Sequence, residues 1–145
     1  MRIVMSLVLI IIVAVALAFV AFGIWVRVAP NEASYWHVDP ATAPDPATPN
    51  FARIDRVTSL APEAAAAAIA TRAGTEGARL IAGDSTHGTW IARTRWMGYP
   101  DFISIRLAPE GDGTRIVGFS RSRFGYRDMG VNRARLRRWI ERLPQ

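Results

Sequence analysis

The C-terminal region of the chain concentrates a side chain that can bind anions. Residues 120–143 read SRSRFGYRDMGVNRARLRRWIERL and hold eight arginines. A guanidinium is always charged and donates hydrogen bonds in a fixed fork, so this density suits phosphate recognition, pairing with buried acids, or a solvated helix face. Composition argues against reading each arginine as specific, because all 18 basic residues of the chain are arginine and none is lysine.

Two of these arginines lie on a predicted strand, on a side that would be buried if another part of the protein covers it. Arg121 and Arg123 are two positions apart in a segment that alternates as a strand does, so both point to the same side. A guanidinium buried there needs acceptors. We therefore predict a structural arginine–aspartate network that joins this strand to the following helix, with an anion-binding site and a catalytic site as alternatives. The predicted network comprises Arg121, Arg123, Asp128, Asp101 and Asn132.

Residues that could support catalysis are few. The two histidines, His37 and His87, are far apart in the sequence and lack a carboxylate cluster at ligand spacing, which makes a poor metal site. Asp84 and Ser85 lie in the same turn as His87, too close for the aligned Ser–His–Asp arrangement with an oxyanion hole. The chain has no cysteine, and its glycines match no phosphate-binding loop. We expect no catalytic residues, no metal and no cofactor, and hence not an enzyme.

The elements that position these residues predict a small α+β domain over residues 51–145. FARIDRV alternates as a half-buried strand, and Pro62 suits the first turn of a helix through the alanine run that follows. Further strands are predicted in ARLIAGD, HGTWIARTRWM, FISIRL and TRIVGFSRS, with PEGDG as a hairpin turn. With a final helix, the order β-α-β-β-β-β-α indicates an antiparallel-rich sheet that carries two helices on one face.

That final helix is predicted over residues 129–143. Asp128 precedes its first turn, where a carboxylate can cap free N–H groups and oppose the helix dipole. Most of its arginines lie off the apolar stripe and are expected to face solvent. The stripe falls at spacings i, i+3, i+4 and i+7, namely at Leu136, Trp139, Ile140 and Leu143.

Residues 1–27 are predicted to form a transmembrane anchor. The 24 residues from Ile3 to Val26 carry no charge, and as a helix they would span roughly 36 Å, against about 30 Å of hydrocarbon. A cleaved signal peptide is the alternative, although its apolar region is normally about 7–15 residues long. Arg2 and the α-amine on one side, against Arg27 on the other, favour a cytoplasmic N-terminus and a periplasmic domain.

Two segments offer candidate contacts with a partner. One anchor face carries small residues that would let another transmembrane helix approach closely. Residues 28–50 form a tether with five prolines, which favours an extended conformation. Its aromatic residues are expected to dock on the protein's own domain, on the membrane interface or on a partner. The candidate contacts are Ala14, Ala18, Ala21, Tyr35, Trp36 and His37.

Several motifs together resemble a known family. They are WHVDP at 36–40, RTR at 93–95, GYPD at 98–101, and the run SRSRFGYRDMGVNR at 120–133. Over roughly residues 35–143 the chain is similar to the bacterial family catalogued as domain of unknown function fourteen ninety-nine, in a membrane-anchored form. The resemblance implies a small anchored and exported protein of a Gram-negative bacterium. It implies no activity and no catalytic residues.

Charge and location leave two expected functions. Residues 51–145 carry sixteen arginines against nine acids, which would attract anionic lipid, acidic proteins or nucleic acid. We expect no nucleic acid, because an exported domain meets none. The first function is a single-span interaction protein, an accessory or assembly subunit of a larger complex in the bacterial inner membrane. The second is an envelope module that binds a lipid or small anionic ligand.

One surface feature is expected to discriminate between these two functions. Trp90, Trp96 and Phe102 are expected on the sheet face away from the helices. If they form a flat exposed patch, a protein partner is favoured. If they line a hollow, a ligand is favoured.

Overall fold

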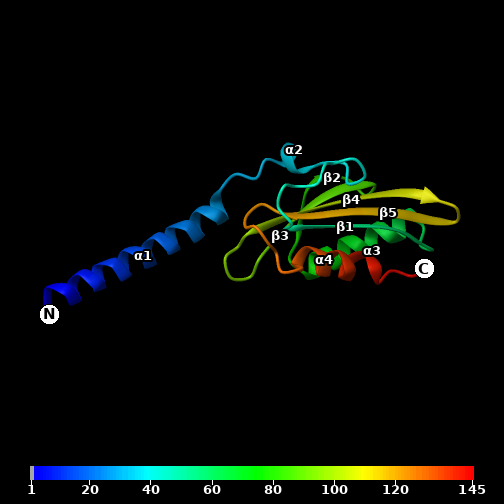
Figure 1. The fold of residues 1–145 in the computed structure, drawn as a ribbon. Helices are drawn as coiled ribbons and strands as arrows, with labels where there is room; N and C mark the ends of the chain where they lie inside the picture. The colour runs from blue at the N-terminus through cyan, green and yellow to red at the C-terminus, as the bar shows by residue number, and fades with distance from the viewer. Residues whose placement is uncertain (1) are drawn as a thin grey trace.

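The computed structural model describes residues 2–145 and consists of one long helix attached to one small domain (Figure 1). Helix α1 (Arg2–Val28) has 27 residues and extends away from the domain. Among the described residues it is the one helix long and apolar enough to cross a membrane, over Ile3–Val28. Most of that stretch is exposed, and Gly23 and Val26, near its C-terminal end, are buried against the domain. The helix fits the predicted anchor by length and composition, and an N-terminal signal sequence meets the same two criteria.

A five-stranded antiparallel sheet forms the centre of the domain. Its strands are β1 (Phe51–Thr58), β2 (Arg79–Gly83), β3 (His87–Arg93), β4 (Pro100–Glu110) and β5 (Gly113–Ser122). The spatial order is β1-β5-β4-β3-β2, so β5, which carries Arg121, lies inside the sheet between β1 and β4. The long β4–β5 hairpin pairs Asp101 with Ser122 at one end and Glu110 with Gly113 at the other. The predicted α+β class and antiparallel sheet are confirmed.

Helices cover one face of this sheet, and strand alternation decides which residues meet them. The helices are α3 (Pro62–Thr75), α4 (Val131–Leu136) and the π-helical turn η1 (Arg137–Glu141). Ile103, Ile105 and Leu107 occupy alternate positions of β4, so all three point to this side and pack with Trp139 in the core. Close packing is possible because β5 carries Gly118, where an added Cβ would lie 2.9 Å from the Ile140 side chain.

The last helical segment differs from the prediction at its start and in its geometry. It begins at Val131 instead of residue 129, because Met129 and Gly130 both have positive φ, 51° and 82°. From Arg137 onward the backbone widens into a π-helical turn. The predicted stripe is nevertheless buried, which shows that apolar spacing determined the packing of this segment.

The three large aromatic residues expected on one sheet face are separated in the structure. Trp90 points toward the helices and contacts Trp139 edge to face, with ring centroids 6.3 Å apart. Phe102 is fully buried on the opposite face, because neighbouring strand positions alternate. Trp96 lies in the turn after β3 and is exposed. They form neither the expected patch nor a hollow, so this feature does not discriminate between the two functions.

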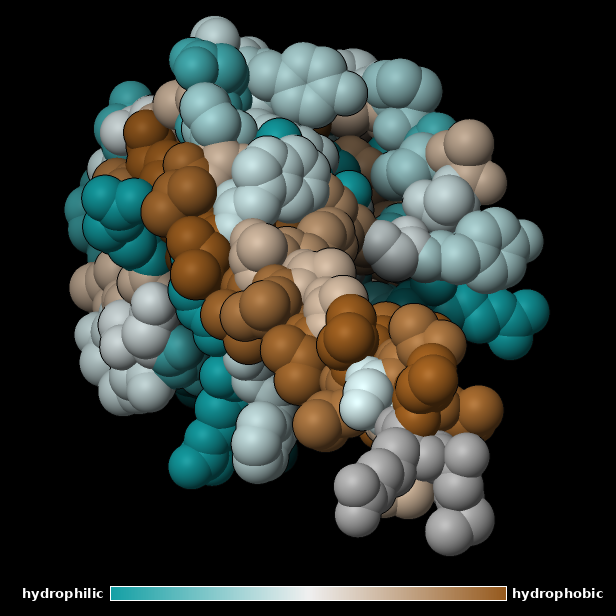
Figure 2. Space-filling model, turned by 90° about the vertical axis from the view of Figure 1, so that its left-hand side faces the viewer, coloured by the Kyte–Doolittle hydropathy of each residue, from teal (hydrophilic) through white to brown (hydrophobic). Residues whose placement is uncertain are grey.

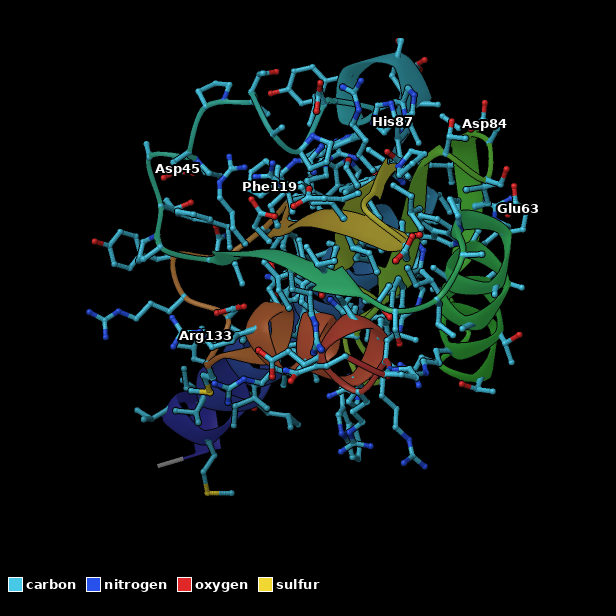
Figure 3. The ribbon with its side chains drawn as sticks, turned by 90° about the vertical axis from the view of Figure 1, so that its right-hand side faces the viewer. Asp45, Glu63, Asp84, His87, Phe119 and Arg133 are labelled. Atoms are coloured by element: carbon cyan, nitrogen blue, oxygen red, sulfur yellow. The ribbon has the colours of Figure 1, made fainter. Side chains whose placement is uncertain are left out.

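The tether covers the sheet face opposite the helices. It contains one short helix, α2 (Ala33–Trp36). Residues 33–48 arch over the sheet, while α3 and α4 lie on the other side (Figures 1 and 3). The sheet therefore lies between a helical layer and a layer of irregular chain.

Candidate functional site

Trp36 packs the tether against the sheet face opposite the helices. Its ring stacks on Phe102 with centroids 3.8 Å apart and planes 6° from parallel. Because α2 ends at Trp36, its carbonyl is available to other donors. It accepts hydrogen bonds from the Ser104 hydroxyl at 3.3 Å and from the Arg121 guanidinium. The tether thus docks on the protein's own domain, which is one of the three docking surfaces expected from the sequence.

Arg121 is a buried guanidinium without a carboxylate partner. It is 6% exposed, and it donates to the Ser104 hydroxyl at 3.2 Å as well as to Trp36. Its guanidinium carbon lies 4.6 Å from the centroid of the Phe119 ring. None of the ion pairs in the described part of the chain includes Arg121. Burial, and secondarily the charge of Arg53, lowers the pKa of Arg121 to about 10.

A pair of stacked histidines joins the tether to β3. His37 and His87 lie with ring centroids 4.2 Å apart, and Figure 3 shows His87 beside α2. His37 Nδ1 is 2.9 Å from the Thr89 hydroxyl, and His87 Nε2 donates to the Val38 carbonyl at 3.0 Å. Burial and then the neighbouring His87 lower the pKa of His37, while the Asp84 carboxylate opposes them. The docked position therefore favours the neutral form of His37.

Two further arginines, which the sequence analysis missed, hold the tether in place. Arg53 on β1 donates to the Asp45 carboxylate and to two tether carbonyls, each at 2.6 Å. Arg106 on β4 forms an ion pair with Asp39. Charge was the sequence signal that could have indicated these contacts, because an acidic tether precedes a basic domain. Which arginine pairs with which acid depends on the order of the strands in the sheet.

A hollow of about 350 Å³ lies beside Arg121, between the tether and the sheet. Its walls include Tyr35, Trp36 and Phe119 together with tether prolines. In Figure 3, Phe119 lies beneath the tether segment that carries Asp45. A cation flanked by aromatic rings suits a small anion that also has an apolar part.

The predicted network residues divide between the two faces of the sheet. On the helix side, Asp101 pairs with Arg135 at 2.9 Å, and both side chains are buried. Asn132 is also buried there, and its Oδ1 accepts a hydrogen bond from the Ser120 hydroxyl at 2.5 Å. The arginine that joins strand to helix is thus Arg135, which was expected in solvent, in place of Arg121.

Arg123 and Asp128, both members of the predicted network, do not pair in the structure. The Asp128 carboxylate accepts two backbone N–H groups at the start of α4, at 2.8 and 3.1 Å, and acts as the predicted cap. Arg123 donates instead to the Pro30 carbonyl at 2.6 Å and to the Asn31 side chain at 2.7 Å. The strand ends at Ser122, so strand alternation does not fix the direction of Arg123.

The end of α1 packs directly onto the domain. Val26 and Ala29 are buried. Arg27 donates to the Trp96 carbonyl at 2.8 Å, and Arg93 donates to the carbonyls of Val26 and Arg27, both at 3.3 Å. The two bonds from Arg93 cap carbonyl groups at the C-terminus of α1, which otherwise lack partners.

Aromatic pairs extend this junction along one face of α1. Phe22 contacts Tyr99 with ring centroids 6.3 Å apart, and Trp25 contacts Phe124 at 5.5 Å. Gly98 has φ 71°, and a Cβ there would lie 2.9 Å from the Arg27 side chain, so glycine permits both the turn and the contact. Helix α1 and the domain therefore meet through a specific interface.

The small-residue face of α1 takes no part in this junction. Ala14, Ala18 and Ala21 are exposed in the structure. Figure 2, which views the molecule from the α1 side, shows the brown apolar helix in front of a domain whose visible surface is mostly teal and white. The contrast in hydropathy marks where the apolar helix α1 ends and the more polar domain begins.

The residues considered for catalysis serve a structural turn. Asp84 Oδ1 accepts hydrogen bonds from the Thr86 N–H and hydroxyl, both at 2.7 Å, and from the His87 backbone N–H at 3.1 Å. These bonds, led by the Thr86 hydroxyl, lower the pKa of Asp84 to about 2. The carboxylate thus closes the β2–β3 turn and does not orient the imidazole. Residues 2–145 contain no group of three or more His, Cys, Asp or Glu side chains that could hold a metal.

Comparison with known proteins places the domain in a sequence family. Residues 28–143 match the family model described as "Protein of unknown function (DUF1499)". No curated protein matches the chain. Among solved structures, the chain is similar to protein CV1439 from Chromobacterium violaceum, with 16% identity and a TM-score of 0.40, over 51% of this chain and 80% of that one. That similarity is too distant to bear on function.

Proposed function

The chain belongs to the family described as protein of unknown function DUF1499, a description that assigns no activity, and we propose a function from the geometry of anchor and domain. The protein is a single-span protein of the bacterial inner membrane, with a cytoplasmic N-terminus and a periplasmic domain. It is an interaction protein without enzymatic activity, an accessory or assembly subunit of a larger membrane complex.

The packing of the last turns of α1 onto the domain carries this proposal. A flexible linker would suffice if the anchor only kept the domain at the membrane. Here Arg27 and Arg93 bond across the junction, and Val26 is buried in it. The domain is therefore held at one height and orientation. Such preorganisation lowers the entropic cost of binding a partner that lies in the same membrane.

The exposed alanine face supports a partner with a transmembrane helix of its own. Ala18 lies at its centre, between Ala14 and Ala21, and the domain does not cover it. Small residues on such a face permit close helix approach and strong van der Waals packing in lipid. Ala16 lies on the opposite side of the helix, 200° from Ala14 at about 100° per residue, and provides a matched control.

Site-specific photo-crosslinking in native membranes tests this function. A photoreactive residue replaces Ala18 in one full-length variant and Ala16 in another. We expect a discrete crosslinked membrane protein from position 18 and not from position 16, and the same protein in mild-detergent purifications of the unmodified chain. Crosslinks to lipid alone from both positions, with a chain that purifies by itself, would contradict the proposal.

A second candidate function, an envelope module for a small anionic ligand, is favoured by Arg121 and the adjoining hollow. A ligand that supplied an anion would provide the charge partner that this guanidinium lacks. Phenyl phosphate is a suitable probe, because it combines an anion with an aromatic ring. Binding should raise the melting temperature of the full chain. The rise should be equal in an Arg115→Gln control, which also removes one positive charge but in an exposed ion pair away from the hollow. An unchanged melting temperature at saturating probe would exclude this ligand class.

A further inference from the structure

Two loops at the base of the anchor expose apolar side chains that no contact within the protein explains. We call residues 94–99 and 123–130 the junction loops. Trp96 is 87% exposed, Tyr126 66% and Met129 99%. Figure 1 shows both loops at the end of the domain from which α1 emerges. Solvent exposure of a whole indole is costly unless a nonaqueous phase covers it.

The same end of the molecule carries positive charge that the protein does not neutralise. Five arginines lie in or beside the junction loops, and none of them enters an ion pair among the described residues. The acid in these loops, Asp128, is occupied with capping α4. The arginines are Arg27, Arg93, Arg95, Arg123 and Arg127.

Two of these charges, those of Arg27 and Arg123, act on Arg93. Burial, followed by the charges of Arg79, Arg27 and Arg123, lowers the pKa of Arg93 from its ordinary value. A cluster of like charges beside exposed aromatic rings is unfavourable in an isolated molecule. It becomes favourable where an anionic, partly apolar phase meets the protein.

The position of α1 identifies that phase. Arg27 at the end of the helix bonds to Trp96 in one junction loop, and Trp25 contacts Phe124 in the other. Both loops are thus attached to the part of α1 that would leave the hydrocarbon. Tryptophan and tyrosine are enriched at that depth, because their rings are amphipathic. In a membrane, lipid headgroups surround this part of α1. A protein partner could cover the junction loops only by displacing those headgroups.

We propose that the junction loops form a second membrane contact, in which Trp96 and Tyr126 enter the interface and the surrounding arginines bind the phosphates of anionic lipids. The inference rests on the proposed anchoring of the chain by α1. It goes further by assigning a lipid class and a binding surface to the domain. Arg95 and Arg127 are the assigned headgroup contacts, since both are exposed.

Depth measurements on the full chain in vesicles test this surface directly. The chain has no cysteine, so one introduced cysteine carries one spin label, placed in turn at Trp96, Tyr126, Val57 and Val13. Val57 is an exposed apolar residue near the far end of β1, and Val13 reports insertion of α1. In phosphatidylcholine vesicles that contain phosphatidylglycerol, labels 13, 96 and 126 should be accessible to oxygen and shielded from a water-soluble nickel chelate. Label 57 should show the reverse.

Charge variants separate the aromatic and electrostatic parts. With Arg95→Gln and Arg127→Gln together, the ratio of lipid-exposed to water-exposed label 126 should fall about fivefold per arginine, which corresponds to about 1 kcal/mol each. Arg137→Gln and Arg142→Gln, on the C-terminal segment, should leave the ratio unchanged.

The possible outcomes distinguish this inference from the proposed function. Labels 96 and 126 that remain in water while label 13 is in lipid would overturn the second membrane contact and leave the anchor intact. Equal insertion in pure phosphatidylcholine, unaffected by the arginine substitutions, would overturn the assignment of anionic headgroups. A water-accessible label 13 would contradict the anchor itself, and both proposals with it.

Discussion

At the scale of residues, the two faces of one sheet stabilise buried arginine in different ways. Arg135 meets a full carboxylate charge from Asp101. Arg121 meets a carbonyl, a hydroxyl and aromatic rings, and retains its charge without a counter-ion. Only the first arrangement is balanced electrostatically. The first is therefore expected to be a stability element, and the second a place where an additional anion would be tolerated.

The Asp101–Arg135 pair should be essential to stability. Asp101→Asn leaves a buried guanidinium without its counter-charge, and breaking such a pair typically costs about 3–5 kcal/mol. The measurement is urea unfolding of the full chain in detergent. Glu76→Gln, which removes the partner of the more exposed Arg138, is the control and should cost about 0–1 kcal/mol. Equal losses for the two variants would show that burial does not distinguish them.

Docking of the tether should depend on pH through His37. Its pKa is lowered when docked, from an ordinary value of 6.5, so the undocked tether binds more protons between those two pKa values. Docking is therefore fully favourable above about pH 6.5 and weakens as pH falls toward the docked pKa. Asp84, with a pKa of about 2, stays ionised throughout and does not contribute to the change.

Hydrogen exchange over residues 33–38, corrected for intrinsic rates, measures this opening above and below pH 6.5. Protection should fall at the lower pH in the unmodified chain. In His37→Gln it should be nearly independent of pH, because the imidazole whose pKa is lowered on docking is absent. Protection that stays constant across pH 6.5 in the unmodified chain would refute the role of His37.

Partner choice was the part of the site that residue patterns could not predict. Spacing showed on which side of the strand Arg121 lies, but not that the Trp36 carbonyl of the tether and the Ser104 hydroxyl would be its acceptors. Asp101 was correctly included among buried partners, yet it was offered to the strand arginines Arg121 and Arg123, whereas the structure pairs it with Arg135. These choices depend on strand order and on the path of the tether, and neither is encoded locally.

At the scale of elements, local periodicity carried most of the information. Alternation in FISIRL placed Ile103 and Ile105 in the core, and helical spacing placed Leu136 and Trp139 there. The π-helical turn at Arg137 was not predictable, because it alters the winding without altering the composition of the buried stripe. The tether was the least predictable element, since it has little regular structure and is ordered by contacts with distant strands.

Adjacent tether residues should differ sharply in their contribution to docking. Trp36→Ala removes the stacked ring over Phe102 and should cost about 2 kcal/mol from lost apolar burial and ring stacking. Tyr35→Ala removes an exposed ring, and its effect should stay within about 0.5 kcal/mol. Denaturant unfolding gives the free energies, and limited proteolysis reports whether the tether opens. Comparable effects of the two substitutions would contradict the observed docking geometry.

At the scale of the whole molecule, charges far apart in the sequence gather at the C-terminal end of α1. Arg93, Arg95, Arg123 and Arg127 join Arg27 there only after the domain has folded. Insertion into a membrane responds instead to basic residues within about 15–20 residues of the span. The four domain arginines that lie beside Arg27 in the folded protein are therefore not among the charges that determine how α1 is oriented in a membrane.

This separation predicts the topology and a control for it. An alkaline phosphatase fused after Gln145 should be active, because Arg2 and the α-amine outweigh Arg27 beside the span and keep the N-terminus in the cytoplasm. Arg95→Gln with Arg127→Gln should leave the orientation unchanged. Basic residues inserted directly after Val28 should reduce phosphatase activity and increase the fluorescence of a matching green fluorescent protein fusion, which requires the cytoplasm. A fluorescent fusion to the unmodified chain, with an inactive phosphatase fusion, would place the domain in the cytoplasm and reverse the assigned orientation.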